Sequence, residues 1–187
     1  MLPELLLPLI LLAGYAVFIW YLWRETTEMS GARSGSTKAK RPERTARAQE
    51  SVLFVCTHNS ARSQMAEALL REAAGGRFRV ASAGTAPTRV HPLAEQAMAE
   101  RGLSLESHRA KALAEMGTRW DYVITVCDAA YERCPEFPAK TSRLHWSIED
   151  PSRATGTPAQ QLDAFRRVRD DLAERITRWV ADRPDKP

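Results

Sequence analysis

Apolar residues follow two different patterns along this chain. Residues 5–23 form one uninterrupted uncharged run, whereas from residue 51 onward apolar residues gather in short segments separated by polar ones. Three of those segments, 52–56, 78–83 and 122–127, have the apolar, partly β-branched composition that is typical of strands buried on both faces. Residues 142–146 predict a shorter fourth strand.

Helix-period patterns lie between and after these strands. The first carries Met65 and Leu69 four residues apart and ends at residues 75–76, a Gly pair, and the second begins at Pro92 and ends at Gly102. The last is the clearest, because its apolar residues recur at spacings of three and four: Leu162, Phe165, Val168, Leu172, Ile176 and Trp179. Strands alternating with helices predict an α/β fold of three layers around a four-stranded parallel sheet, which binds its ligand beyond the carboxyl ends of the strands.

The N-terminal run predicts a membrane anchor. Its 19 uncharged residues are just long enough, as a helix, to cross a bilayer core of about 30 Å. Trp20, Tyr21 and Trp23 crowd its end. Basic residues follow: Arg24, Arg33, Lys38, Lys40, Arg41, Arg44 and Arg47. By the positive-inside rule we expect a single-pass protein of the inner or plasma membrane, with its C-terminal domain in the cytoplasm.

This interpretation divides the chain into a transmembrane anchor (1–24), a flexible basic linker (25–50) and a globular domain (51–187). A cleaved signal peptide is the rival, since residues 30–32 are small, and translation from Met29 would remove the run altogether. The linker suits a solvated tether better than a nucleic-acid arm. Residues 51–187 carry 20 basic and 18 acidic residues, a net charge of only +2, so we expect no nucleic-acid partner.

Candidate chemistry lies between the first strand and the first helix. The segment reads Cys56, Thr57, His58, Asn59, Ser60, Ala61, Arg62 and Ser63. A turn that runs into a helix N-terminus directs backbone N–H groups at one point and favours an anion, and Arg62 adds donors matched to a tetrahedral oxyanion. In this field we expect a lowered pKa for the Cys56 thiol, which would make it a nucleophile. The plainer reading is a buried cysteine that ends a strand.

The other two of the three cysteines also have informative positions. Cys127 ends the third strand, on the same sheet edge as Cys56, and Cys134 follows after six residues of a predicted polar loop. The spacing is wide for a zinc pair, and no second pair of ligands completes such a site. The anion loop alone does not choose between hydrolysis and reduction of a bound oxyanion. A dithiol that becomes a disulfide supplies two electrons, which favours reduction.

These motifs resemble a known family. The loop from Cys56 to Ser63, together with Asp150-Pro151, is similar to the low-molecular-weight protein tyrosine phosphatases across residues 51–182. Four further segments resemble the thioredoxin-coupled arsenate reductases, a branch of that fold: 126–135, 145–146, 149–151 and 165–170.

The resemblance implies a relay of three thiols. Cys56 attacks arsenate held by the loop, with phosphate as a competitor, and Asp150 protonates the leaving oxygen. Cys127 then attacks Cys56, and Cys134 attacks Cys127, which leaves a Cys127–Cys134 disulfide for thioredoxin to reduce. No cofactor and no metal are expected. The alternatives are a phosphotyrosine phosphatase working through a Cys56 phosphocysteine, and a redox-sensing or oxyanion-binding module without turnover.

Supporting roles follow from the same resemblance. We expect Asn59 to brace the loop by hydrogen bonds from its side chain to the loop backbone, and Ser63 to donate a hydrogen bond to the sulfur. One subgroup binds potassium through positions that correspond to Asn59, Glu67, Ser82 and an acid that is Lys111 here, so we predict that the Lys111 ammonium replaces the ion. His58 stands where glycine is common, which makes the geometry of the loop less certain. His91, His108 and His145 are interpreted as structural.

Overall fold

The computed structural model describes residues 49–134 and 140–183. The predicted anchor over 1–24 and all but the end of the linker lie outside the described residues. No helix within the two described ranges has the length and apolarity needed to cross a membrane.

Four parallel strands form the sheet, as predicted. They are β1 (Glu50–Cys56), β2 (Phe78–Gly84), β3 (Tyr122–Thr125) and β4 (Ser142–His145), in the order β2-β1-β3-β4. All neighbouring pairs are parallel, so their carboxyl ends share one edge. The register sets Cys56 beside Gly84 of β2 and Val55 beside Thr125 of β3. The predicted juxtaposition of strand ends near Cys56 is therefore confirmed.

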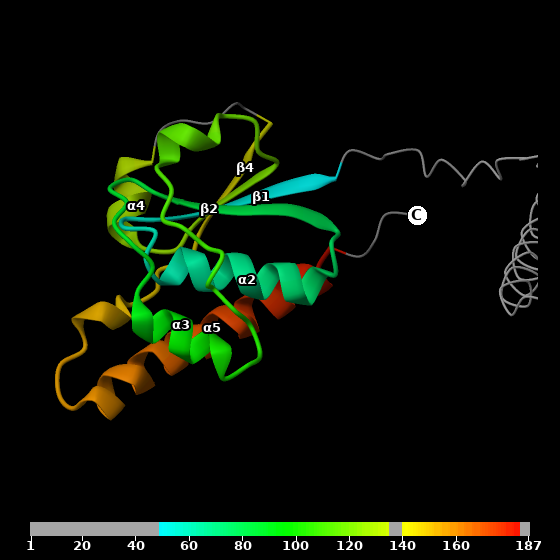
Figure 1. The fold of residues 1–187 in the computed structure, drawn as a ribbon. Coiled ribbons are helices and arrows are strands. Elements are labelled where there is room, and N and C mark those ends of the chain that lie inside the picture. The colour runs from blue at the N-terminus through cyan, green and yellow to red at the C-terminus, as the bar shows by residue number, and fades with distance from the viewer. Residues whose placement is uncertain (1–48, 135–139, 184–187) are drawn as a thin grey trace, which may run out of the picture. The chain divides into compact units, whose positions relative to one another are not determined.

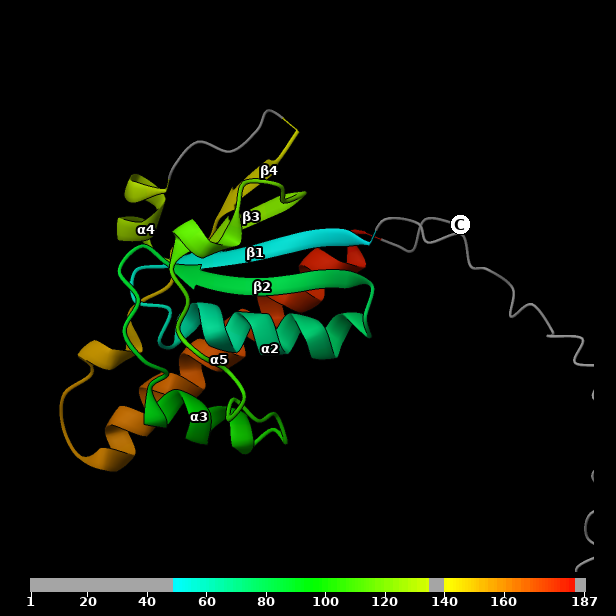
Figure 2. The same ribbon diagram turned by 45° about the horizontal axis from the view of Figure 1, so that its top comes forward.

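Helices connect the strands. They are α2 (Arg62–Ala74), α3 (Pro92–Ala99), α4 (Asp128–Arg133) and α5 (Pro158–Ala181), with 3-10 helices η2 (Leu113–Met116) and η3 (Pro151–Arg153). In Figures 1 and 2, α2 and α5 lie on one side of the sheet with α3 beside them, while η2 lies on the other side. The expectation of a polar loop after Cys127 is wrong, because six of those residues form α4.

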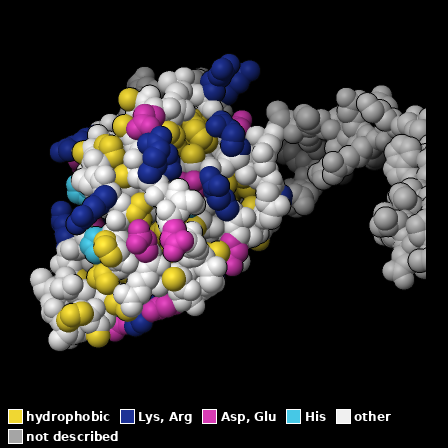
Figure 3. All heavy atoms as spheres, viewed as in Figure 1, with side chains coloured by type: hydrophobic (Ala, Val, Ile, Leu, Met, Phe, Trp, Pro, Cys, Tyr) yellow, Lys and Arg dark blue, Asp and Glu magenta, His cyan; other side chains and the backbone are white. Residues whose placement is uncertain are grey.

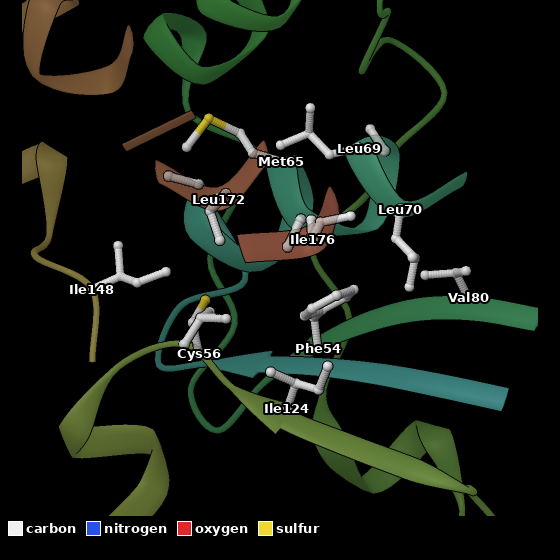
Figure 4. Close-up of a cluster of buried hydrophobic side chains, with 14 of the residues drawn as sticks. Phe54, Cys56, Met65, Leu69, Leu70, Val80, Ile124, Ile148, Leu172 and Ile176 are labelled. Carbon is white, nitrogen blue, oxygen red and sulfur yellow. The ribbon is translucent and has the colours of Figure 1, made fainter. Parts of the chain in front are cut away.

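The core lies between the sheet and helices α2 and α5. Figure 4 shows Phe54 and Ile124 of the strands facing Leu172 and Ile176 of α5, all fully buried. Burying an apolar side chain of this size contributes roughly 1.5–3 kcal/mol, so this layer is the main source of stability. Helix α5 begins at Pro158, and the preceding Thr157 caps it reciprocally with Gln160. The apolar spacing in its sequence is thus explained by one buried face.

Charged side chains of both signs share the surface. On the face seen in Figure 3, Lys and Arg side chains lie among Asp and Glu side chains instead of forming one continuous basic area. Several pairs bridge α3 and α5, among them Arg166 with Glu100 at 2.5 Å and Arg169 with Glu100 at 3.3 Å. These pairs join the second helix to the last one.

Candidate active site

The anion loop occupies the turn from β1 into α2. Cys56 is the last residue of β1 and Arg62 is the first of α2, so the loop spans residues 57–61. Among the described residues other than glycine, only Asn59 has a positive φ, at 47°. The concern about His58 is therefore misplaced, since the left-handed residue is its neighbour, an Asn that tolerates this region well. No side chain caps the N-terminus of α2, which leaves its first N–H groups directed at the loop.

Gly84 lets the loop pass close to β2. A Cβ atom at this position would lie 2.7 Å from the Thr57 carbonyl oxygen and 2.8 Å from the Asn59 nitrogen. Both neighbours are backbone atoms, which have no room to move aside. A glycine is therefore required at the end of β2 for the loop to keep this path.

The Cys56 sulfur sits at the floor of the loop. It lies 2.9 Å from the Ser63 hydroxyl and accepts a hydrogen bond from the Asn59 N–H at 3.1 Å, as the sequence suggested for Ser63. The residue is only 2% exposed, and in Figure 4 it borders the apolar cluster beside Ile148. Burial raises the pKa of the Cys56 thiol, while the bonds from Ser63 and the charge of Arg62 lower it. The expected net lowering of this pKa is wrong, because removal from water outweighs the loop's positive field.

Asn59 braces the loop, but its side chain bonds to neighbouring side chains and to the Lys111 N–H, and not to the loop backbone as predicted. Its Nδ2 donates to the hydroxyls of Ser63 at 2.8 Å and Ser82 at 2.9 Å. Its Oδ1 accepts from the Lys111 N–H at 2.8 Å and from Gln64 Nε2 at 3.0 Å. Every donor and acceptor of this buried amide is thereby oriented, and the Ser63 hydroxyl beside Cys56 is held in place.

A lysine fills the position expected for a cation. The Lys111 ammonium lies 3.3 Å from Glu67 Oε2, which also accepts a 2.6 Å hydrogen bond from Ser82. Arg71 pairs with the other oxygen of Glu67 at 2.6 Å. The carboxylate is 96% buried and has both a lysine and an arginine partner, so positive charge already lies against one of the residues expected to bind the ion.

Arg62 and Asp150 meet at the mouth of the loop. The Arg62 guanidinium donates to Asp150 Oδ2 at 2.7 Å and to the Ile148 carbonyl at 3.0 Å, which leaves three of its five N–H groups for an anion. Burial raises the pKa of Asp150, but hydrogen bonds from Ser152 and the charge of Arg62 bring it below its usual value. Asp150 also accepts the Ser152 N–H that begins η3. The structure thus brings both predicted residues to the loop, with Asp150 ionised.

The second thiol lies beside the loop. The Cys127 sulfur is 3.5 Å from the Thr57 hydroxyl and is buried, whereas Cys134 at the far end of α4 is partly exposed. All three cysteines are free. Burial also raises the pKa of Cys134, and the charge of Arg143 lowers it. The structure therefore brings Cys127 to the anion loop and keeps Cys134 away from it.

Gln64 is a site residue that sequence reasoning missed. Its Nε2 donates to the Asn59 and Arg109 carbonyls at 3.1 and 2.9 Å, and its Oε1 lies 2.7 Å from His108 Nδ1. His108 thus has a partner across the fold. His91 is the N-cap of α3, where its ring accepts the Leu93 N–H. A glutamine directly after the loop carries no signal of this kind in the sequence.

A cavity of about 270 Å³ opens beside the loop. It is lined by His58, Ser60, Thr88, Arg89, His91, Pro92 and Ser152. Among these lining residues there is no Phe, Tyr or Trp, Arg89 is the one Lys or Arg, and the lining surface is polar and apolar in equal parts.

These features define a phosphatase-type anion site on an α/β fold, and comparison with known proteins agrees. The family model for low molecular weight phosphotyrosine protein phosphatases matches residues 51–185. The chain belongs to this family.

Its relatives include arsenate reductases. The arsenate reductase of Bacillus licheniformis is 36% identical over 133 residues, which cover 71% of this chain and 96% of that protein. Among solved structures, an arsenate reductase in the phosphate-binding state has a TM-score of 0.60 at 30% identity, covering 71% of this chain and 98% of its own. The thioredoxin-dependent arsenate reductase of Corynebacterium glutamicum has a TM-score of 0.59 at 29% identity. The match covers 73% of this chain and 63% of that protein.

Proposed function

We propose that this protein reduces arsenate to arsenite by a thiol relay and is recycled by thioredoxin. The observation that carries the proposal is the placement of Cys127 against the anion loop, with its sulfur 3.5 Å from the Thr57 hydroxyl. A hydrolase needs one thiol at this place, whereas a reductase needs a second thiol within reach of the first. The arsenate reductases among the relatives support the same reaction.

The first step is attack on arsenate. The loop amides and the free donors of Arg62 hold the oxyanion, and the Cys56 thiolate forms a sulfur–arsenic bond as one oxygen leaves as water. Asp150 supplies the proton. An oxyanion on Arg62 competes with Asp150 for the guanidinium, and its negative charge raises the pKa of that carboxyl, so binding itself favours the protonated acid.

The second step reduces the arsenic. The Cys127 thiolate attacks the Cys56 sulfur, and the sulfur–arsenic bond breaks with its electron pair left on arsenic. Arsenic passes from the +5 to the +3 state and leaves as arsenite, while the two thiols become a Cys56–Cys127 disulfide. Two electrons leave the protein and two arrive on arsenic, so the step balances.

The third step moves the disulfide outward. The Cys134 thiolate attacks Cys127, which frees the Cys56 thiolate and forms a Cys127–Cys134 disulfide that the dithiol of thioredoxin reduces. Cys127 and Cys134 are seven positions apart, and the rise of a helix over seven positions separates their Cα atoms by about 10 Å. A disulfide needs its two Cα atoms about 4.4–6.8 Å apart. Helix α4 must therefore unwind before this bond forms.

Phosphotyrosine hydrolysis is the second candidate, because the family includes tyrosine phosphatases and the loop with Asp150 would serve both reactions. The cavity beside the loop argues against it, because no Phe, Tyr or Trp lines it. An aryl leaving group is best held between large apolar or aromatic side chains, and the residues lining this cavity offer two imidazoles, hydroxyls, Arg89 and Pro92 instead.

Attachment to the inner or plasma membrane through residues 5–23 belongs to the same proposal. The uncharged run and the basic residues after it support a catalytic domain in the cytoplasm, where thioredoxin is reduced. Membrane fractionation, with labelling of Cys56 by an impermeant reagent from each side, tests it. Labelling from the periplasmic side would contradict the orientation.

The reaction is tested by coupling the full-length protein to thioredoxin, thioredoxin reductase and NADPH. Arsenate should drive NADPH oxidation with arsenite as the product, and phosphate should compete. Aryl phosphate hydrolysis is measured on the same preparation. Rapid hydrolysis without arsenate-driven electron flow would establish the phosphatase in place of the reductase.

A further inference from the structure

Helix α4 is fastened to the end of β4 by His145. The His145 Nε2 lies 2.9 Å from Asp128 Oδ1, and its Nδ1 lies 2.8 Å from the Thr125 hydroxyl. A carboxylate only accepts hydrogen bonds, so His145 Nε2 donates to Asp128. The Thr125 hydroxyl, which donates to the Leu144 carbonyl at 3.3 Å, lies against the other ring nitrogen. The imidazole thereby bridges the end of β3 and the first residue of α4.

Tyr131 covers the same imidazole. The two rings lie 4.6 Å apart between centroids with 33° between their planes, and the Arg143 guanidinium is 5.9 Å from the Tyr131 ring. Tyr131 is 50% exposed, so His145 and Arg143 provide much of its packing. None of these groups touches the anion loop in the described contacts, and the three steps above do not use them.

We propose that Asp128, Tyr131 and His145 form a latch that holds α4 helical while Cys127 and Cys134 are reduced, and that thereby sets how readily these two thiols form their disulfide. The inference rests on the proposed relay, because it assigns the latch to the pair of thiols that the relay oxidises. The three residues are positioning residues, since they act through the helix.

The direction of the effect follows from the two end states. A helix of six residues is far too short to be stable by itself, so α4 depends on its contacts with the rest of the fold. Those contacts include the buried Ala130, the latch, and a hydrogen bond between the Asp128 and Ser147 side chains. The latch exists only when α4 is folded, and the disulfide requires α4 unwound. Every latch contact therefore stabilises the dithiol relative to the disulfide, which leaves the disulfide easier for thioredoxin to reduce.

The test is a redox titration of the full-length protein carrying Cys56→Ser, in which only Cys127 and Cys134 remain. Each disulfide formed consumes one oxidised glutathione and releases two reduced ones, and the fractions are counted by mass spectrometry after alkylation. His145→Ala removes both the hydrogen bond and the ring contact without changing the helix sequence. We expect it to raise the equilibrium constant for disulfide formation about fivefold or more.

Two matched controls separate the latch from general disturbance. Ser142→Ala lies in the same strand and Glu132→Ala lies in the same helix, and neither side chain has a contact with the latch in the described part of the chain. Both control variants should have an equilibrium constant for disulfide formation within about twofold of the parent's. Tyr131→Ala should shift it in the same direction as His145→Ala but by less, because alanine itself favours helix.

Amide hydrogen exchange of the reduced proteins provides a second, independent measurement. Amides of α4 should exchange faster in His145→Ala than in the parent, while those of α2 stay unchanged. If His145→Ala has the parent's equilibrium constant for disulfide formation and the parent's amide exchange rates in α4, the latch is overturned and the relay is left intact. A parent protein whose Cys127 and Cys134 never form a disulfide would overturn the relay, and the latch with it.

Discussion

The Arg62 guanidinium and the Asp150 carboxylate form a 2.7 Å ion pair across the mouth of the anion loop. Their side chains are 8% and 18% exposed, so the pair is well shielded from water. One residue is proposed to hold arsenate and the other to protonate its leaving oxygen. The pair therefore couples substrate binding to the proton supply, because an oxyanion that engages Arg62 weakens the hold on Asp150.

Replacing Asp150 by asparagine should slow arsenate reduction by about 10²-fold, at the low end of the effect of a general acid. The amide keeps the shape of the side chain and has no proton to give. Single-turnover release of arsenite measures the step directly. Glu149→Gln, the adjacent exposed acid, is the matched control and should retain full activity; an equal loss in both variants would remove the special role of Asp150.

The same ion pair predicts a pH dependence of stability. The pKa of Asp150 is lowered in the fold, so its ionised form stabilises the native state above the unfolded-state pKa, and this contribution disappears as pH falls through the lower, folded-state pKa. Urea denaturation should find Asp150→Asn less stable than the parent at pH 7. The difference should shrink steadily below about pH 4. A difference that is constant down to pH 3 would show that the pair contributes no such stability.

Ser63→Ala should raise the pKa of Cys56 further. The hydroxyl lies 2.9 Å from the sulfur and stabilises the thiolate, and burial already opposes ionisation. The pH midpoint of Cys56 alkylation, measured with Cys127 and Cys134 replaced by serine, should move upward. With all three cysteines present, the rate of arsenate reduction at pH 7 should fall about tenfold or more. Ser63→Thr keeps the hydroxyl and should lie close to the parent, and an unshifted midpoint in Ser63→Ala would contradict this role.

Potassium should have no effect on the parent protein. The Lys111 ammonium 3.3 Å from Glu67 already supplies the positive charge, so activity in sodium and potassium buffers of equal ionic strength should agree. Lys111→Ser removes that charge, and its activity should be lower and partly restored by potassium. Arg109→Ser, whose ion pair is with Glu115, is the control. Strong activation of the parent by potassium would refute the replacement.

The sequence predicted the sheet, its parallel order and the anion loop because each depends on a local pattern. Buried strands need apolar runs, and the turn from strand to helix is legible from Cys56 and Arg62. The arrangement of Cys127 beside the loop also followed, since the carboxyl ends of parallel strands share one edge. These inferences needed no knowledge of the packing.

The remaining features depend on contacts that no local pattern encodes. Helix α4 has one buried residue and charged neighbours, so its segment resembled a loop. Its contact with β4, in which Tyr131 packs against His145, joins residues that are distant in the sequence. The pKa of Cys56 was misjudged because burial comes from the packed core and not from the loop. The predicted anchor over residues 5–23 lies outside the described residues and stays a prediction.

The relay is tested most directly by one turnover of the Cys134→Ser protein. One equivalent of arsenate should yield one equivalent of arsenite, and mass spectrometry of the alkylated, digested protein should find a Cys56–Cys127 disulfide. Without Cys134 this disulfide should accumulate, so thioredoxin-coupled turnover should stop after the first cycle. A Cys134→Ser protein that cycles at the parent's rate, or one that yields arsenite without joining Cys56 to Cys127, would contradict the relay.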